Sequence, residues 1–204
     1  ARALPVELQL GPVVDRLDTE LRRRHQRAFT EATRVLDEPR TYALLDALDE
    51  LAATPPFADG ADRRARKALV PVLTKEIRRV RRAGDAVDEA EREDERLAAL
   101  HELRKTAKRA RYAAESAAVV FGPPAEELAT RMEDLQDALG EHQDTVAARA
   151  ELRRIGALVA GHPGENGFSF GVLHEREARA SEVALAPLDR LRRRATKRPV
   201  DPSR

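Results

Sequence analysis

The chain has 204 residues, and its 37 Lys and Arg residues almost balance its 36 Asp and Glu residues, so its formal net charge at pH 7 is only +1. It contains no Cys, which excludes disulfides and thiolate metal sites. No apolar run reaches the roughly 18 to 20 residues that a membrane-spanning helix needs, and no signal peptide is visible. We therefore expect a cytoplasmic protein without a membrane partner.

The composition favours helices over strands. Ala, Leu, Glu and Arg dominate the chain, and these residues form helices readily. Alternating runs of β-branched and aromatic residues, which are typical of strands, are absent from the sequence. The sequence therefore predicts an all-α fold, and the short connections between its later helices favour antiparallel, up-and-down bundles.

The first part of the chain is predicted to hold an extended lead-in and two helices, over about residues 12–36 and 40–53. Asp37-Glu38-Pro39 separates them, and Pro55-Pro56 follows the second helix. We take this proline pair as the boundary between a first lobe, residues 1–57, and a second helical bundle, residues 58–204.

The second bundle is predicted to hold helices over about residues 62–83, 95–121, 124–139, 141–159 and 168–197. Pro71 is expected to kink or divide the first of these helices. Gly84 and the acids that follow it, up to Glu95, are expected to form a solvated connector. Gly140 is expected to end the helix that begins at Pro124.

The predicted helix over residues 95–121 separates an apolar stripe from a basic one. At about 100° per residue the centres of the two stripes lie roughly 130° apart around the helix axis. The apolar stripe comprises Leu100, Leu103, Ala107, Ala110, Ala114, Ala117 and Phe121, and the second comprises His101, Arg104, Lys105, Lys108, Arg111, Tyr112 and Glu115.

Cations that recur one helical turn apart repel one another. Acids on neighbouring helices could offset this repulsion, and so could a bound polyanion. The spacing of about 5 to 6 Å suits a linear chain of phosphates, to which Arg offers forked hydrogen bonds and Lys a movable charge. A solvated face with surface ion pairs is the other interpretation, and the residue pattern alone leaves both open.

A second basic row is predicted on the helix over residues 62–83. It comprises Lys67, Lys75, Arg78 and Arg82, roughly opposite the apolar positions of that helix. If both rows face one groove, they form a positively charged channel, whereas an ordinary exposed face fits the pattern equally well. Cations near the chain end, from Arg190 to Lys197, are interpreted as stabilising a helix C-terminus.

Other kinds of site find little support. There is no Cys, no Ser with an adjacent base and no pair of carboxylates in an apolar setting, so we expect no catalysis. His101, His142 and Asp144 lack the spacing of a helical ligand pair, so we expect no metal and no cofactor. His142 is expected to be exposed at a turn. Seven aromatic residues and no recognition motif argue against nucleic acid.

Two motifs resemble those of a known family. The stretch His101-Glu102-Leu103-Arg104-Lys105, continued to Glu115, closely resembles the signature helix of the CHAD domain, the conserved histidine α-helical domain. Residues 135–144, from Leu135 to Asp144, match the pattern of that family's second half. Residues 36–51, with Arg40 and Tyr42, look like its linker region.

The resemblance implies helical bundles built from two related halves that bind inorganic polyphosphate on a basic surface, in some members at polyphosphate granules. It also implies a CYTH-type triphosphatase domain as a frequent companion. We find no first-half signature helix. We therefore expect residues 1–57 to be the remainder of the first lobe with its linker helices, and residues 58–204 to be the second CHAD-like bundle, with its signature helix over about 95–121.

Carried over by position, the family's histidine is His101. We thus predict a binding module for inorganic polyphosphate that has no catalysis of its own. The alternatives are an accessory domain of a triphosphatase or polyphosphate-metabolising enzyme, a nucleic-acid-binding module, and a scaffold for acidic proteins. The predicted polyphosphate-binding residues are His101, Arg104, Lys105, Lys108, Arg109, Arg111, Tyr112, Lys67, Lys75, Arg78 and Arg82.

Overall fold

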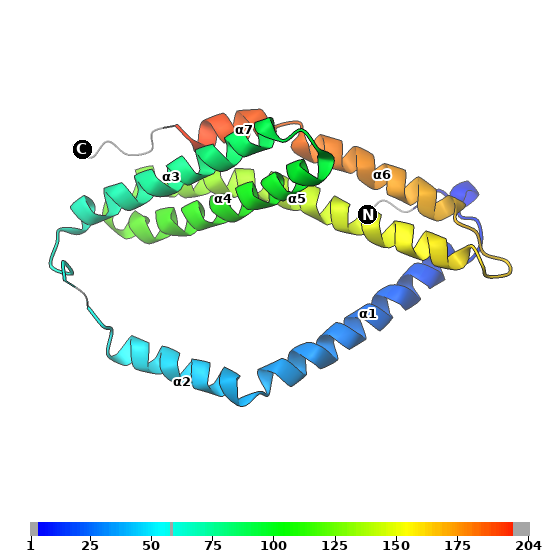
Figure 1. The fold of residues 1–204 in the computed structure, drawn as a ribbon, viewed down its shortest axis with the longest axis horizontal. Helices are drawn as coiled ribbons and strands as arrows, with labels where there is room; N and C mark the ends of the chain where they lie inside the picture. The colour runs from blue at the N-terminus through cyan, green and yellow to red at the C-terminus, as the bar shows by residue number, and fades with distance from the viewer. Residues whose placement is uncertain (1–3, 58, 198–204) are drawn as a thin grey trace. The chain divides into compact units, whose positions relative to one another are not determined.

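The computed structural model describes residues 4–57 and 59–197 (Figure 1). Every regular element within this range is a helix, so the all-α prediction is confirmed. None of the described helices is long and apolar enough to span a membrane. The elements are a 3-10 turn η1 (Val6–Leu8) and the helices α1 (Val13–Leu36), α2 (Pro39–Ala53), α3 (Ala65–Glu89), α4 (Glu93–Phe121), α5 (Pro123–Val159), α6 (Phe168–Leu185) and α7 (Leu188–Ala195).

Residue contacts divide the chain into two compact units. The first comprises the described residues up to Asp62 together with Leu152–Leu173. The second comprises Arg63–Glu151 together with the described residues from His174 onward. The segment Leu152–Leu173, which the sequence placed in the second bundle, therefore packs with α1.

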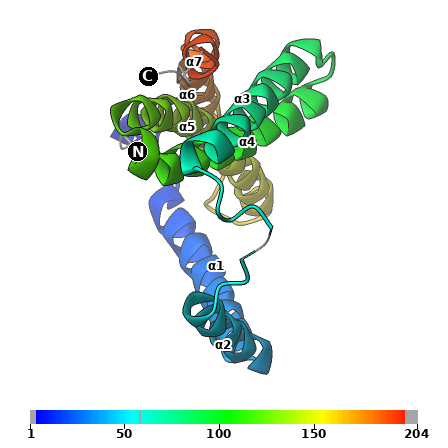
Figure 2. The same cartoon turned by 90° about the vertical axis from the view of Figure 1, so that its left-hand side faces the viewer.

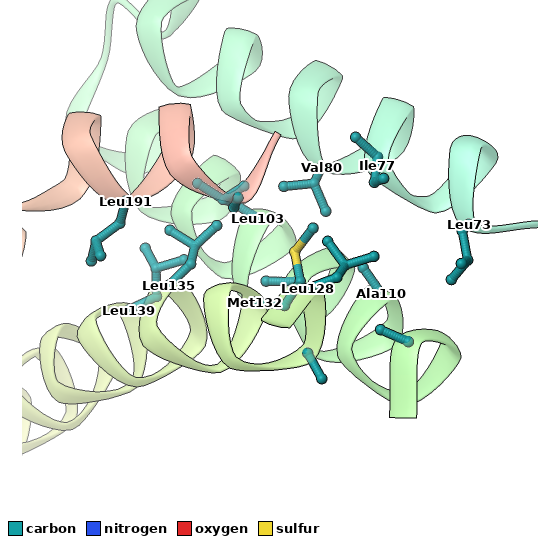
Figure 3. Close-up of a cluster of buried hydrophobic side chains, with 14 of the residues drawn as sticks. Leu73, Ile77, Val80, Leu103, Ala110, Leu128, Met132, Leu135, Leu139 and Leu191 are labelled. Atoms are coloured by element: carbon teal, nitrogen blue, oxygen red, sulfur yellow. The ribbon is translucent and has the colours of Figure 1, made fainter. Parts of the chain in front are cut away.

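The second unit is built around α4, which runs beside α3 as a helical hairpin (Figure 2). Every residue of the predicted apolar stripe of α4 is buried. Each large side chain of this face, Leu100, Leu103 and Phe121, contributes roughly 1.5–3 kcal/mol relative to an exposed one, so this face holds α4 in one rotational position. The stripe packs against side chains of α3, α5 and α7, among them Val80, Leu128, Met132, Leu135, Leu139 and Leu191 (Figure 3).

Local sequence fixes both ends of α4. At its start the Arg92 backbone N–H donates to Glu95 Oε2 at 3.3 Å, which closes a capping box. The acids of the first turn lie where the positive end of the helix dipole favours them. At its end Gly122 adopts a φ of 61°, a conformation that glycine accepts without strain.

α3 is longer than the sequence predicted, and the expected connector from Gly84 to Glu95 is wrong. α3 continues through Pro71 and Gly84 to Glu89, because buried residues recur along one side as far as Val87. Gly84 is itself buried, and a Cβ added there would lie 2.8 Å from Arg192 Nε. This glycine therefore makes room for an arginine and does not end the helix.

Two further boundaries differ from the predictions. α5 is a single helix, so the expected end at Gly140 is wrong. The predicted helix over residues 168–197 is instead divided into α6 and α7 near Pro187. Proline has no N–H to continue the ladder, and the Ala186 N–H is the last to reach back into α6, to Glu182 and Val183.

The first unit has a small core made by α1, the end of α5 and the start of α6. Its buried apolar residues are Leu4, Val13, Leu152, Ile155, Val159 and Phe170. Arg16 forms an ion pair with Glu165, and the Leu10 N–H donates to Ser169 Oγ at 2.8 Å.

α2 buries none of its residues. Its side chains of Tyr42, Leu44, Leu45, Leu48 and Leu51 are between 50% and 58% exposed. A helix of 15 residues with no packed face is marginal in water. Its apolar face is thus without a partner among the residues that the structure describes.

The contrast between α4 and α2 predicts very different responses to leucine truncation. Leu103→Ala opens a cavity in a fully buried site and should lower the free energy of unfolding by about 2–5 kcal/mol. Leu48→Ala removes an exposed side chain and should change that free energy by no more than about 0.5 kcal/mol. Urea unfolding followed by circular dichroism measures both, and equal losses would contradict the described core.

Candidate functional site

The predicted basic stripe of α4 lies along α5. The two helices run antiparallel, since residues farther along α4 meet residues farther back in α5. His101 Nδ1 lies 3.2 Å from Gln143 Oε1, close enough to donate a hydrogen bond. Arg111 Nη1 donates to Glu133 Oε1 at 2.9 Å. We call this side of α4, with the α5 residues that face it, the α4–α5 seam; its contacts pair His101 with Gln143, Arg104 with Gly140, and Arg111 with Glu133.

Arg104 lies in the middle of the seam against the backbone of α5. A Cβ added at Gly140 would lie 3.4 Å from Arg104 Nε and 3.6 Å from its Nη2. The Nε atom is buried and has no hydrogen-bond partner, and no ion pair of Arg104 is found in the described part of the chain. A buried donor without an acceptor is unfavourable, so Arg104 has hydrogen-bonding capacity that an oxygen ligand would fill.

Tyr112 is flanked by two cations of the stripe. Lys108 Nζ lies 5.7 Å from the centre of its ring, and Arg111 Cζ lies 5.0 Å from it. A hydrogen bond to Tyr112, together with the charges of Glu115 and Glu133, raises the pKa of Arg111, so its charge is permanent. Cations over an aromatic face are held in place by the ring quadrupole. Tyr112 therefore keeps Lys108 and Arg111 aligned along the seam.

Part of the row is already neutralised. Lys105 Nζ lies 2.7 Å from Glu102 Oε2, but both side chains are exposed, and such pairs are weak enough for a polyanion to displace. Arg111 is paired with Glu133. Lys108 forms no ion pair with any residue between 4 and 57 or between 59 and 197.

Arg109 belongs to the other side of α4. Its Nε lies 3.2 Å from Glu76 Oε2 of α3, and Glu76 is buried and also paired with Arg79 at 2.6 Å. Arg109 and Arg111 are about 200° apart around the helix. α3 and α5 thus flank α4 on opposite sides, and the structure separates Arg109 from the seam.

The second predicted row does not reach the seam either. Its four residues are exposed and lie on the side of α3 opposite its buried residues. Arg78 Nε donates to the Thr74 carbonyl at 3.4 Å. The structure therefore brings together His101, Arg104, Lys108, Arg111 and Tyr112, and leaves Lys67, Lys75, Arg78 and Arg82 on the outer face of α3.

A cleft of about 410 Å³ between α3 and α7 is a poorer site for a polyanion. Its charged lining is balanced, with three arginines against three aspartates. Arg192 forms two hydrogen bonds to Asp88, at 2.7 and 2.6 Å, and these lower the pKa of Asp88. The cleft already supplies its own counter-charges.

His142 is not an exposed turn residue, so that expectation is wrong. Because α5 continues through Gly140, His142 lies inside a helix and is only 6% exposed. Its Nδ1 is 2.7 Å from Ser181 Oγ of α6, and its Nε2 has no partner among the described residues. No cluster of three or more metal-ligating side chains is found in the described chain.

The sequence reasoning missed what α5 contributes to the seam. Glu133, Gln136, Gly140 and Gln143 recur at spacings of three and four residues, which places them on one side of a continuous helix. This periodicity in the sequence could have predicted the α5 side of the seam. It was overlooked because Gly140 was expected to end the helix, which divides the four residues between two helices.

The comparisons with known proteins agree with these motifs. A family model for the CHAD domain matches residues 1–153, and the chain belongs to this family. The chain is 34% identical over 211 residues to the Uncharacterized protein MT2285 of Mycobacterium tuberculosis (strain CDC 1551 / Oshkosh), and equally to the Uncharacterized protein Rv2226 of Mycobacterium tuberculosis (strain ATCC 25618 / H37Rv). Each comparison covers 95% of this chain and 37% of the relative, so the chain spans little more than a third of their length. No solved structure matches the chain.

The buried His142 predicts a pH dependence of stability. Burial, and then the charges of Arg96 and Arg149, lower the pKa of His142 in the folded state. The unfolded chain therefore takes up the proton first, so stability is full above the unfolded pKa of about 6.5 and is lost as the pH falls below it. His142→Leu should remove this component. Urea unfolding at pH 7.5 and pH 5 compares the two proteins, and parallel pH profiles would show that His142 does not titrate as described.

Proposed function

We propose that this chain binds inorganic polyphosphate along the α4–α5 seam. The observation that carries the proposal is the pair Arg104 and Lys108, adjacent cations of one stripe that form no ion pair within the described residues. Membership of the CHAD family supports it. His101 and Arg111 extend the same stripe on either side, so the stripe covers about 15 Å of helix.

The electrostatics of the stripe favour a linear ligand. Like charges one turn apart raise the energy of the unliganded helix, and a polyanion lying along them relieves every repulsion at once. Binding also releases counterions condensed on the phosphate chain, which makes affinity strongly dependent on salt. A single small anion relieves only one or two of these repulsions.

The remaining predicted residues are assigned lesser roles in this proposal. Lys105 contributes by exchanging its exposed partner Glu102 for phosphate. Arg109 stays with the buried Glu76, and the exposed cations of α3 attract the ligand through their long-range field without coordinating it.

The proposal is binding without turnover. The seam contacts among the described residues join Arg111 to a carboxylate, His101 to an amide and Lys108 to an aromatic ring, and none of these contacts aligns a base with a nucleophile. In the cell we propose association with polyphosphate granules, and in longer relatives a CYTH-type triphosphatase domain as companion. Phosphate release by the purified chain in the presence of Mg²⁺ would favour the enzyme alternative.

Charge reversal on the seam tests the proposal. The double variant Lys105→Glu with Lys108→Glu should weaken binding of long-chain polyphosphate about a hundredfold, because it removes two cations and adds two repulsions. The matched control is Arg190→Glu with Lys197→Glu, which changes the net charge equally on exposed residues of the last turns of the described chain. Fluorescence anisotropy with labelled polyphosphate measures both, and circular dichroism checks helicity. Similar losses in the two variants would indicate non-specific attraction.

Salt and competition separate polyphosphate from nucleic acid. The plot of log affinity against log salt should be steep, and each seam cation replaced by Ala should lower its slope by roughly 0.7 to 0.9. Single-stranded RNA at equal phosphate concentration should not displace polyphosphate, because the seam offers only Tyr112 for base stacking. Displacement by RNA would favour the nucleic-acid alternative.

A further inference from the structure

We infer that the seam holds one binding site for condensed phosphate, called the seat, between Arg104 and Lys108. In this inference Gly140 of α5 positions Arg104, and Gln136 of α5 contributes a further hydrogen bond to the ligand. This inference rests on the proposed function and narrows it to one place in the row. It assigns the ligand-facing role of α5, whose residues were absent from the predicted site.

The residues at the two ends of the seam already have partners within the protein. Arg111 is held by Glu133 at one end, and His101 is held by Gln143 at the other. Between these contacts α5 presents Gly140 and Gln136, neither of which carries charge. Asp137 is exposed and forms no ion pair in the described structure. Between the two contacts, no ion pair among the described residues joins a cation of α4 to a side chain of α5.

Two buried polar atoms between these two contacts are unsatisfied. Arg104 Nε and Gln136 Oε1 are each buried without a hydrogen-bond partner in the part of the chain that is described. Gln136 precedes Gly140 by one helical turn, so both face α4. Arg104 as a whole is half-buried and Lys108 is exposed, so a phosphate oxygen can accept from the Arg104 guanidinium and from Lys108 Nζ. Rotation of the Gln136 amide about its last bond places the donor Nε2 where Oε1 lies, which supplies a third hydrogen bond.

Gly140 sets how closely the Arg104 guanidinium approaches α5. The added Cβ would lie 3.4 Å from Nε, which is ordinary contact, so alanine fits. The further carbons of a longer side chain would enter the space that the guanidinium occupies. Replacing Gly140 by a residue larger than alanine would thus turn the Arg104 side chain away from the seat without removing any charge.

The spacing of the seat selects condensed phosphates. Arg104 and Lys108 lie one turn apart, with about 5 to 6 Å between their Cβ atoms, so two phosphates joined through one oxygen can contact both. A single orthophosphate can form close contacts with only one of these two cations at a time. Tripolyphosphate should therefore compete with labelled polyphosphate at concentrations where orthophosphate, matched in total phosphate, does not.

The experiment compares glycine substitutions in two helices by polyphosphate titration. Gly140→Ala should stay within about twofold of the unaltered chain, and Gly140→Leu should bind about tenfold more weakly. Gly171→Leu is the matched control, because Gly171 lies in α6 and an added Cβ there meets nothing within 4 Å. In an Arg104→Ala background Gly140→Leu should have no further effect, which a merely structural role would not produce.

If Gly140→Leu shifts the unfolding midpoint, its loss of affinity could come from altered folding, so a second variant is needed. Gln136→Leu keeps the size of the side chain and removes its amide, and it should weaken binding several-fold with the midpoint unchanged. The inference is overturned if folded Gly140→Leu and Gln136→Leu both bind normally, or if Gly140→Leu loses as much affinity without Arg104. If charge reversal abolishes binding while these variants bind normally, polyphosphate binding along the seam is supported but the seat between Arg104 and Lys108 is contradicted. If the unaltered chain binds no polyphosphate, the proposed function itself fails.

Discussion

Burial of one face of α4 is the constraint on which the site depends. Seven apolar residues of this helix are buried, and together they fix its rotation about its own axis. Once that rotation is fixed, Arg104 and Arg111 must point toward α5 and Arg109 must point toward α3. The same apolar periodicity that stabilises the bundle thus distributes the cations between two neighbours.

The distribution of acids then decides which cations are available. Glu76 is buried between Arg79 and Arg109, and Glu133 holds Arg111, so these charges serve the packing of the helices. Arg104 instead lies against Gly140, and Lys108 lies over the ring of Tyr112. On the proposed function, helix packing and ligand binding use different members of one basic row along the seam. A division of this kind lets a protein with a net charge of only +1 concentrate positive charge locally, as the proposed polyanion site requires.

The sequence predicted the all-α fold and the two faces of α4, because apolar residues recur there with the period of a helix. It failed at Gly84 and Gly140, since a glycine that ends a helix and a glycine that admits a neighbouring arginine are alike in a local pattern. The error at Gly140 had two consequences: His142 was placed at a turn although it is buried, and the α5 side of the seam was overlooked. The cations of α3 looked equivalent to those of α4, because only tertiary packing shows which helix face meets α5.

We propose that the Arg104 guanidinium, whose Nε has no partner among the described residues, takes phosphate as its ligand. Nitrogen-15 NMR of the arginine Nε–H groups, recorded during titration with tripolyphosphate, reports on this contact. We expect a large, saturable shift of the Arg104 signal and almost none for Arg192, whose guanidinium is already bound to Asp88. An unchanged Arg104 signal in protein saturated with the ligand would contradict it.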